Sequence, residues 1–142
     1  MKIKIAILGS TGSIGKSTVK IIKDNPKNFD VVLLTANNNY KELAKQAKEL
    51  KAKNLIINNP KILEKLKNKI KNKNIKIHED LKNFSNKNKK KIDYTMCSIS
   101  GLSGLQPTLE AIKFSKKVAI ANKESIICGW SLINKNLKKY KT

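Results

Sequence analysis

The sequence contains no arginine, few aromatic residues and few acidic ones. All 31 of its basic residues are lysine, only 10 of its 142 residues are acidic, and the formal net charge is +21. Such a charge attracts polyanions. Without arginine, however, the chain has no guanidinium fork for guanine or phosphate, and aromatic residues at 5% give little support for stacking on bases. We therefore interpret the lysines as a solvated surface and expect no nucleic-acid partner, with nucleic-acid binding as the alternative.

Cysteine and long apolar runs are also scarce. Cys97 and Cys128 are not spaced as metal ligands, and two thiols in a chain without a secretion signal indicate a reduced, cytoplasmic protein. No apolar run reaches the roughly 18 residues that a membrane-spanning helix needs, so we expect no membrane partner. The N-terminus leads directly into a strand pattern, from which we expect no targeting segment.

The most informative stretch is residues 2–19, KIKIAILGSTGSIGKSTV. An apolar, β-branched run of strand length is followed by three glycines at three-residue spacing and then by a helical pattern. A strand that leads through such a turn into a helix forms an anion site, because the first N–H groups of the helix point at the turn. Gly9 would allow the tight turn, Gly12 the close approach of a pyrophosphate, and Gly15 close packing of helix on strand.

The glycine spacing separates two kinds of phosphate site. It is Gly-x-x-Gly-x-x-Gly, and the phosphate loop of ATPases is excluded because position 10 is Ser where that loop needs Gly. Dinucleotide binding is thus favoured over a turn that is only structural.

Strand and helix patterns alternate along the whole chain. This alternation predicts an α/β fold: a Rossmann-like, doubly wound, mainly parallel sheet with helices on both faces. The length predicts one domain, residues 1–142. Strands are expected at residues 3–8, 29–35, 55–57, 75–77, 93–98 and 118–121. Helices are expected at 17–22, 40–53, 60–70, 107–114 and 126–140, the last interrupted or bent near Gly129, with a short helix and a solvated loop at 81–91.

Four loops are expected at the carboxyl ends of the strands, where ligands bind in such sheets: residues 9–14, 36–39, 98–104 and 122–125. An NAD site usually places Asp or Glu about 20 residues after the glycines to hold the ribose 2′-hydroxyl. Residues 37–39 are instead three asparagines, with Lys41 close behind. Without a carboxylate to repel a 2′-phosphate, NADP(H) is favoured over NAD(H), the alternative being that these residues form a polar turn.

Three motifs together resemble one enzyme family. LGSTGSIGKST at 8–18, GLSGLQPTLEAI at 101–112 and IANKESIICG at 120–129 are similar to 1-deoxy-D-xylulose 5-phosphate reductoisomerases, over the full length of the chain. The resemblance implies an enzyme that depends on NADPH and on Mg²⁺ or Mn²⁺. Such an enzyme isomerises and reduces 1-deoxy-D-xylulose 5-phosphate to 2-C-methyl-D-erythritol 4-phosphate in non-mevalonate isoprenoid biosynthesis. It also implies a homodimer for the complete enzyme.

The same resemblance implies a set of site residues. The NADPH pyrophosphate would be bound by Thr11, Gly12, Ser13 and Ile14. The adenosine side of the cofactor would be contacted by Asn39. Other parts of the cofactor would be contacted by Asn122 and Glu124. Lys123 would face the substrate, where a cation beside the nicotinamide can stabilise a developing oxyanion. The alternative for Lys123 is a solvated surface lysine.

Two departures from the family pattern modify these expectations. The family often has Gly-Lys or Gly-Arg before the asparagine at position 39, whereas here Asn37 and Asn38 offer no cation to a 2′-phosphate. The family's metal ligands come from an Asp-Ser-Glu-type motif, and the chain stops at Thr142 before any such motif. We therefore expect the NADPH-binding domain alone, without catalytic residues or metal ligands. The alternatives are a cationic nucleic-acid-binding protein on a Rossmann-like scaffold, or another NAD(P)-dependent reductase.

Overall fold

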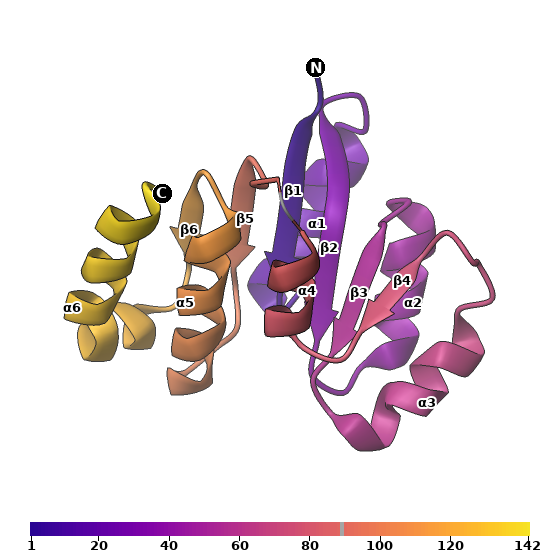
Figure 1. Ribbon diagram of the computed structural model, residues 1–142. Coiled ribbons are helices and arrows are strands. Elements are labelled where there is room, and N and C mark those ends of the chain that lie inside the picture. Colours follow the sequence, from indigo (N-terminus) through magenta and orange to yellow (C-terminus); the bar gives the residue numbers. More distant parts are fainter. Residues whose placement is uncertain (89) are drawn as a thin grey trace.

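The computed structural model describes residues 1–88 and 90–142, in which strands and helices alternate (Figure 1). The strands are β1 Ile3–Leu8, β2 Phe29–Ala36, β3 Asn54–Ile57, β4 Lys76–His78, β5 Tyr94–Cys97 and β6 Val118–Ile120. The helices are α1 Ser13–Asp24, α2 Tyr40–Glu49, α3 Pro60–Lys69, α4 Leu81–Lys87, α5 Leu105–Phe114 and α6 Lys123–Tyr140, with a 3₁₀ turn η1 at Leu102–Gly104. The expected α/β fold is confirmed.

All six strands form one parallel sheet in the order β4-β3-β2-β1-β5-β6. The chain runs outward from β1 to β4 and then returns to the other side of β1 for β5 and β6. The direction of winding therefore reverses between β1 and β5. The loops that follow these two strands diverge at that point and leave a crevice, which is where ligands bind in doubly wound sheets.

Alternate residues of β1 face the two helical layers. Ile5 and Ile7 lie in a buried cluster with residues of α1, α2 and α3, whereas Ala6 and Leu8 lie in a second cluster with α4 and α5. In Figure 1, α4 and α5 lie in front of the sheet and α1 lies behind it. Residues 5–8 of β1 are thus buried on both faces, as their uninterrupted apolar run predicts.

Two helices begin three or more residues earlier than the sequence predicts. α1 begins at Ser13 rather than at residue 17, so the last part of the glycine motif is its first turn. α6 begins at Lys123 and continues through Gly129 without interruption, so the predicted interruption is wrong. Gly129 is instead buried against α5, because a Cβ there would lie 2.9 Å from Leu105 Cδ2.

Other boundaries differ by a few residues. α2 ends at Glu49 rather than at residue 53, because Lys51 takes a left-handed conformation (φ 52°) that turns the chain toward β3. The sequence predicts a short helix and a solvated loop at residues 81–91, and Lys89 in this segment lies outside the described residues. No helix in residues 1–88 and 90–142 is long and apolar enough to cross a membrane.

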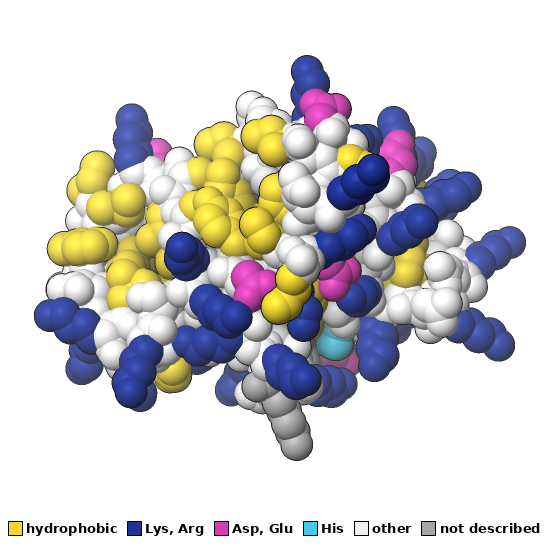
Figure 2. All heavy atoms as spheres, turned by 90° about the horizontal axis from the view of Figure 1, so that it is seen from above, with side chains coloured by type: hydrophobic (Ala, Val, Ile, Leu, Met, Phe, Trp, Pro, Cys, Tyr) yellow, Lys and Arg dark blue, Asp and Glu magenta, His cyan; other side chains and the backbone are white. Residues whose placement is uncertain are grey.

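On the face that Figure 2 shows, lysines are spread over the surface, and exposed apolar side chains gather at the α6 end and in a second patch near the centre. The exposed residues at the α6 end include Ile127, Trp130 and Leu132 of α6.

Candidate functional site: a cleft at the carboxyl ends of the strands

The glycine motif forms a tight turn between β1 and α1. Gly9 has φ +80°, a conformation that side chains disfavour, and the N–H of Gly12 donates to Gly9 O at 3.1 Å. A Cβ on Gly15 would overlap Gly9 O and lie 2.7 Å from Ser10 Cα. Gly15 therefore lets α1 pack on the turn itself, rather than on the strand as the sequence suggested.

The first turn of α1 offers unpaired backbone donors. Gly12 is the N-cap residue and no side chain caps this end of the helix, so the N–H groups of Ser13 and Ile14 lack the partners that a capping residue supplies. The positive end of the helix dipole lies at the same place. This arrangement can hold an anion without a charged side chain.

Two hollows lie side by side at this edge of the sheet. The first, of about 290 Å³, lies among the loops after β1, β2, β3 and β5, and Thr11, Gly12 and Asn37 line it. The second, of about 300 Å³, brings Ile14 together with Asn122, Lys123 and Glu124. Because the loop after β5 contributes Ser98 and Ser100 to both, the two hollows form one continuous site, which we call the cofactor cleft after the ligand that its sequence motifs predict.

Asn122 is buried and holds the second hollow in shape. Its Oδ1 accepts from the N–H of Ser125 at 2.9 Å, and its Nδ2 donates to the carbonyl oxygens of Ile99 and Gly101. The side chain thus ties the start of α6 to the loop after β5. Direct contact of this side chain with a cofactor stays a prediction.

The remaining predicted residues lie at the edges of the cleft. Lys123 is exposed at the first position of α6, and Glu124 beside it is half-buried. Ser13 is exposed next to Gly12. Asn39 is exposed at the N-cap of α2, where its Oδ1 accepts from the N–H of Glu42 at 3.1 Å. The structure brings the predicted residues to one edge of the sheet, with Ser13 and Asn39 outside the walls of both hollows.

The motifs of this cleft are matched in known proteins. The sequence model of the 1-deoxy-D-xylulose 5-phosphate reductoisomerase family matches residues 5–129. The chain belongs to this family.

Relatives in this family resemble the chain over almost its whole length. The 1-deoxy-D-xylulose 5-phosphate reductoisomerase of Pelagibacter ubique is 57% identical over an alignment of 147 residues, gaps included, that covers 98% of this chain. The solved structure of the Zymomonas mobilis reductoisomerase in complex with NADPH superposes with a TM-score of 0.90 at 34% identity over 100% of this chain. A reductoisomerase complex with NADPH, fosmidomycin and magnesium superposes with a TM-score of 0.83 at 30% identity over 97% of the chain.

The chain spans little more than a third of the length of these relatives. It covers 36% of the Pelagibacter protein, 38% of the Zymomonas structure and 34% of the magnesium complex. Within residues 1–88 and 90–142, no three His, Cys, Asp or Glu side chains come together as metal ligands. The described residues therefore offer no set of ligands that would fit a divalent cation such as the magnesium of that complex.

Cys97 ends β5 close to the cleft but is not a nucleophile. Burial raises the pKa of the Cys97 thiol to about 12, although a hydrogen bond with Thr108 acts in the opposite direction. At neutral pH the thiol therefore stays protonated, and the thiolate is the reactive form.

Sequence reasoning missed one residue that contacts the reductoisomerase glycine turn. Gln46 of α2 is fully buried, and its Nε2 donates to Ser10 O at 3.1 Å. A signal was present in the sequence, because Gln46 lies within the apolar stripe that Leu43 and Ala47 define, where a polar side chain is unusual.

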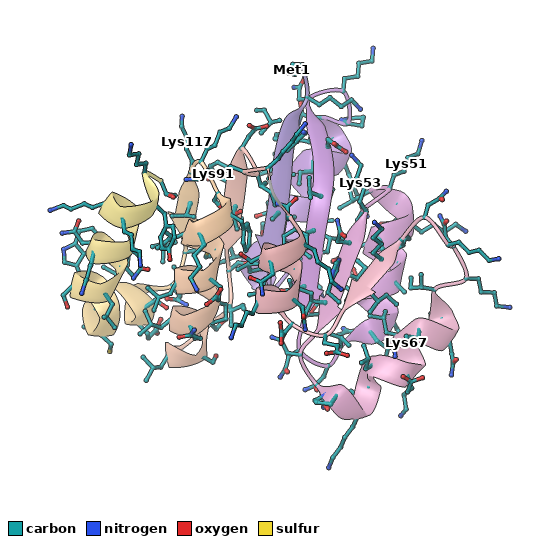
Figure 3. The ribbon with its side chains drawn as sticks, in the orientation of Figure 1. Met1, Lys51, Lys53, Lys67, Lys91 and Lys117 are labelled. Atoms are coloured by element: carbon teal, nitrogen blue, oxygen red, sulfur yellow. The ribbon has the colours of Figure 1, made fainter. Side chains whose placement is uncertain are left out.

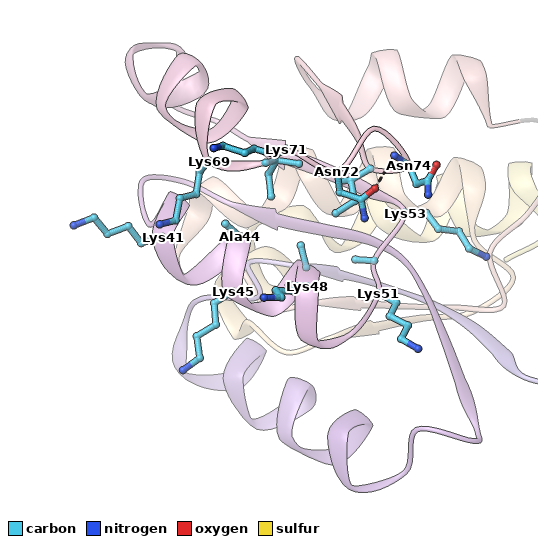
Figure 4. A pocket seen from close by; sticks show the side chains of 14 residues that line it. Lys41, Ala44, Lys45, Lys48, Lys51, Lys53, Lys69, Lys71, Asn72 and Asn74 are labelled. Atoms are coloured by element: carbon cyan, nitrogen blue, oxygen red, sulfur yellow. Dashed lines mark hydrogen bonds between the residues drawn. The ribbon is translucent and has the colours of Figure 1, made fainter.

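A third hollow, of about 970 Å³, lies elsewhere on the described surface. It lies between α2 and the segment after α3, and we call it the lysine hollow (Figure 4). Its lining includes seven lysines: Lys41, Lys45, Lys48, Lys51, Lys53, Lys69 and Lys71. Lys51 and Lys53 lie near the amino ends of the strands, away from the cofactor cleft (Figure 3). None of the predicted site residues lines it.

Proposed function

We propose that this chain is the NADPH-binding part of a 1-deoxy-D-xylulose 5-phosphate reductoisomerase. The complete enzyme would isomerise 1-deoxy-D-xylulose 5-phosphate and reduce the product with NADPH to 2-C-methyl-D-erythritol 4-phosphate. The observation that carries the proposal is the uncapped start of α1 in the glycine turn, at the point where the sheet reverses its winding. An anionic dinucleotide is the ligand that this geometry fits best.

The glycine turn fits a pyrophosphate by its chemistry. Gly12 lines the first hollow without a Cβ, so phosphate oxygens can approach the backbone N–H groups of Ser13 and Ile14. Thr11 adds a hydroxyl at the same wall. The loop at residues 37–39 carries no carboxylate that would repel a 2′-phosphate, which favours NADPH over NADH.

The second hollow would hold the nicotinamide end of NADPH and the substrate. NADPH supplies a hydride when it is bound. Asn122 keeps the loop after β5 and the start of α6 at a constant separation, so the ring has a defined place. The ammonium of Lys123 projects from the first turn of α6, where it can stabilise negative charge on a substrate oxygen.

The metal-dependent rearrangement needs residues beyond this chain. A divalent cation requires several oxygen ligands at set positions, and the described residues hold no such cluster. Residues 1–142 alone should therefore bind NADPH without turning over the substrate. We place the protein in the cytoplasm, because Cys97 and Cys128 are both free thiols, as in reducing compartments. A homodimer of the complete enzyme stays a prediction.

A chimera tests this proposal. This chain replaces the matching segment of the Pelagibacter ubique relative, which is 57% identical to it. We expect the chimera to oxidise NADPH in the presence of Mg²⁺ and 1-deoxy-D-xylulose 5-phosphate, whereas residues 1–142 alone should not. A chimera that folds but shows no substrate-dependent oxidation would contradict the proposal, as would metal-dependent turnover by residues 1–142 alone.

A further inference from the structure

Gln46 is a polar residue in an apolar environment, and half of its amide has no partner. The side chain is fully buried on the face of α2 that packs against the sheet. Its Oε1 accepts no hydrogen bond from the described residues. A buried acceptor without a partner lowers stability, so an apolar side chain of the same length would serve the core at least as well. The use of Gln46 must therefore lie in its amide donor.

The amide nitrogen of Gln46 makes two hydrogen bonds. Nε2 donates to Ser10 O in the glycine turn and to Glu42 Oε1 in the first turn of α2, both at 3.1 Å. The Ser10 backbone is held from its other side as well, because its N–H donates to Thr35 O at 2.8 Å. Gln46 therefore helps to set the direction of the Ser10 carbonyl, two residues before Gly12.

Glu42 connects Gln46 to the other end of the cleft. The N–H of Glu42 donates to Asn39 Oδ1 at 3.1 Å, and its carboxylate accepts from Gln46. Asn39 ends the loop at residues 37–39, which would meet the adenosine 2′-phosphate. An unbroken series of hydrogen bonds thus runs from this loop to the turn that would receive the pyrophosphate.

We propose that Gln46 is a positioning residue for the dinucleotide, which holds the pyrophosphate turn and the adenosine loop in register. This inference rests on the proposed function. Gln46 touches no ligand itself, because it is buried beneath both segments. Its effect should be greatest for a ligand that reaches both segments and small for one that reaches only the adenosine loop.

The test uses Gln46→Met, which keeps the length of the side chain and removes both donors. We expect the Kd for NADPH to rise about tenfold, the size of one lost hydrogen bond in a preorganised site. The Kd for 2′-AMP, which lacks the pyrophosphate, should change less than about twofold. Gln46→Glu, which replaces the donor with an acceptor facing Glu42, should weaken NADPH binding further.

Leu66→Val is the matched control. Leu66 is fully buried on α3, and its apolar side chain takes no part in the hydrogen bonds that join the pyrophosphate turn to the adenosine loop. It should lower the melting temperature without changing the ratio of the two dissociation constants. Unchanged NADPH affinity in folded Gln46→Met would overturn the inference, and so would equal weakening of NADPH and 2′-AMP. If the unmodified chain binds no NADPH, the proposed function itself is wrong.

Discussion

The cofactor cleft and the lysine hollow differ in what holds their polar groups in place. The lysine hollow is larger, at about 970 Å³ against about 290 and 300 Å³ for the two parts of the cleft, and it has seven lysines in its lining. Each ammonium, however, stands on a flexible stem that loses conformational freedom when it binds a ligand. The cleft would instead bind its ligand through backbone N–H groups and amide side chains that the fold already holds in place. A large volume and a high positive charge are therefore not sufficient criteria for locating a cofactor site.

The two regions also arise differently from the fold. The cleft collects loops from the ends of five strands, β1, β2, β3, β5 and β6, around the switch point between β1 and β5. The lysine hollow has a floor of small apolar side chains, Ala44, Ala47 and Ala52, and its lysines come mainly from one helix and the segments that flank it. The walls of the cleft therefore come from many separate loops, whereas those of the lysine hollow come from α2 and from the segments at residues 51–53 and 69–75.

The two regions should differ most in how a larger side chain in each changes the Kd for NADPH. Gly12→Val would place a branched side chain at the proposed pyrophosphate site, and NADPH should bind at least 100-fold more weakly, about 2.7 kcal/mol. The fold should survive, because a Cβ at residue 12 lies 3.4 Å from Gly9 O, an ordinary contact. Ala44→Val adds bulk to the lysine hollow and should leave the Kd unchanged. NADPH titrations and melting curves of both variants check this, and undiminished binding by folded Gly12→Val would show that the turn is only structural.

The cleft should also distinguish NADPH from NADH. Residues 37–39 offer amides and no carboxylate, so we expect about a tenfold preference for NADPH, which at saturation adds about 1.4 kcal/mol to its stabilisation of the folded state. Melting temperatures measured with each cofactor at equal concentration report this difference. Equal shifts for the two cofactors would remove the assignment to NADPH.

Charge removed from the lysine hollow should have little effect on the cofactor. Lys48→Gln combined with Lys71→Gln should change the Kd for NADPH less than about twofold at physiological ionic strength, because exposed charges beyond a Debye length are screened. Retention on a polyanion column should fall, and equally so for Lys135→Gln with Lys138→Gln on α6. A tenfold loss of NADPH affinity in the lysine-hollow variant, without such a loss in the α6 variant, would contradict the claim that the lysine hollow does not contribute to cofactor binding.

The smallest effect concerns His78, at the β4 edge of the sheet. Its Nε2 lies 2.8 Å from Asn54 Oδ1. Burial, with the positive charges of Lys87 and Lys76, lowers the pKa of His78 below its ordinary value. The folded state thus binds this proton less tightly than the unfolded state does. Stability should be full above the ordinary pKa of about 6.5 and should decline as the pH falls below it.

Urea unfolding of the unmodified chain and of His78→Leu, each at about pH 7.5 and pH 5.5, isolates the contribution of this histidine. The decline should be smaller in the variant. NADPH affinity should be insensitive to the substitution, since His78 lies outside the cofactor cleft. An equal decline in both proteins would mean that His78 does not carry the effect.

Apolar periodicity and glycine spacing are enough to predict the parallel sheet and the cleft at its edge. These two sequence patterns reflect local backbone preferences, which can be recognised without knowledge of distant contacts. The start of α1 was missed because its N-cap is Gly12, which lacks the side-chain oxygen that marks most helix starts. Gly129 was interpreted as a break because its partner, Leu105, is distant in the sequence. Gln46 was missed for the same reason, since its contact with Ser10 exists only after α2 packs against the glycine turn.

Calorimetric titration of NADPH into residues 1–142, at low and at raised ionic strength and with DNA as competitor, tests the central claim most directly. We expect saturable binding of one NADPH per chain that persists at raised ionic strength and resists displacement by DNA, because neutral donors held by the fold supply most of the contacts. Binding that vanishes with salt and yields to DNA would assign the affinity to the lysines. That result, or the absence of saturable binding, would contradict the account.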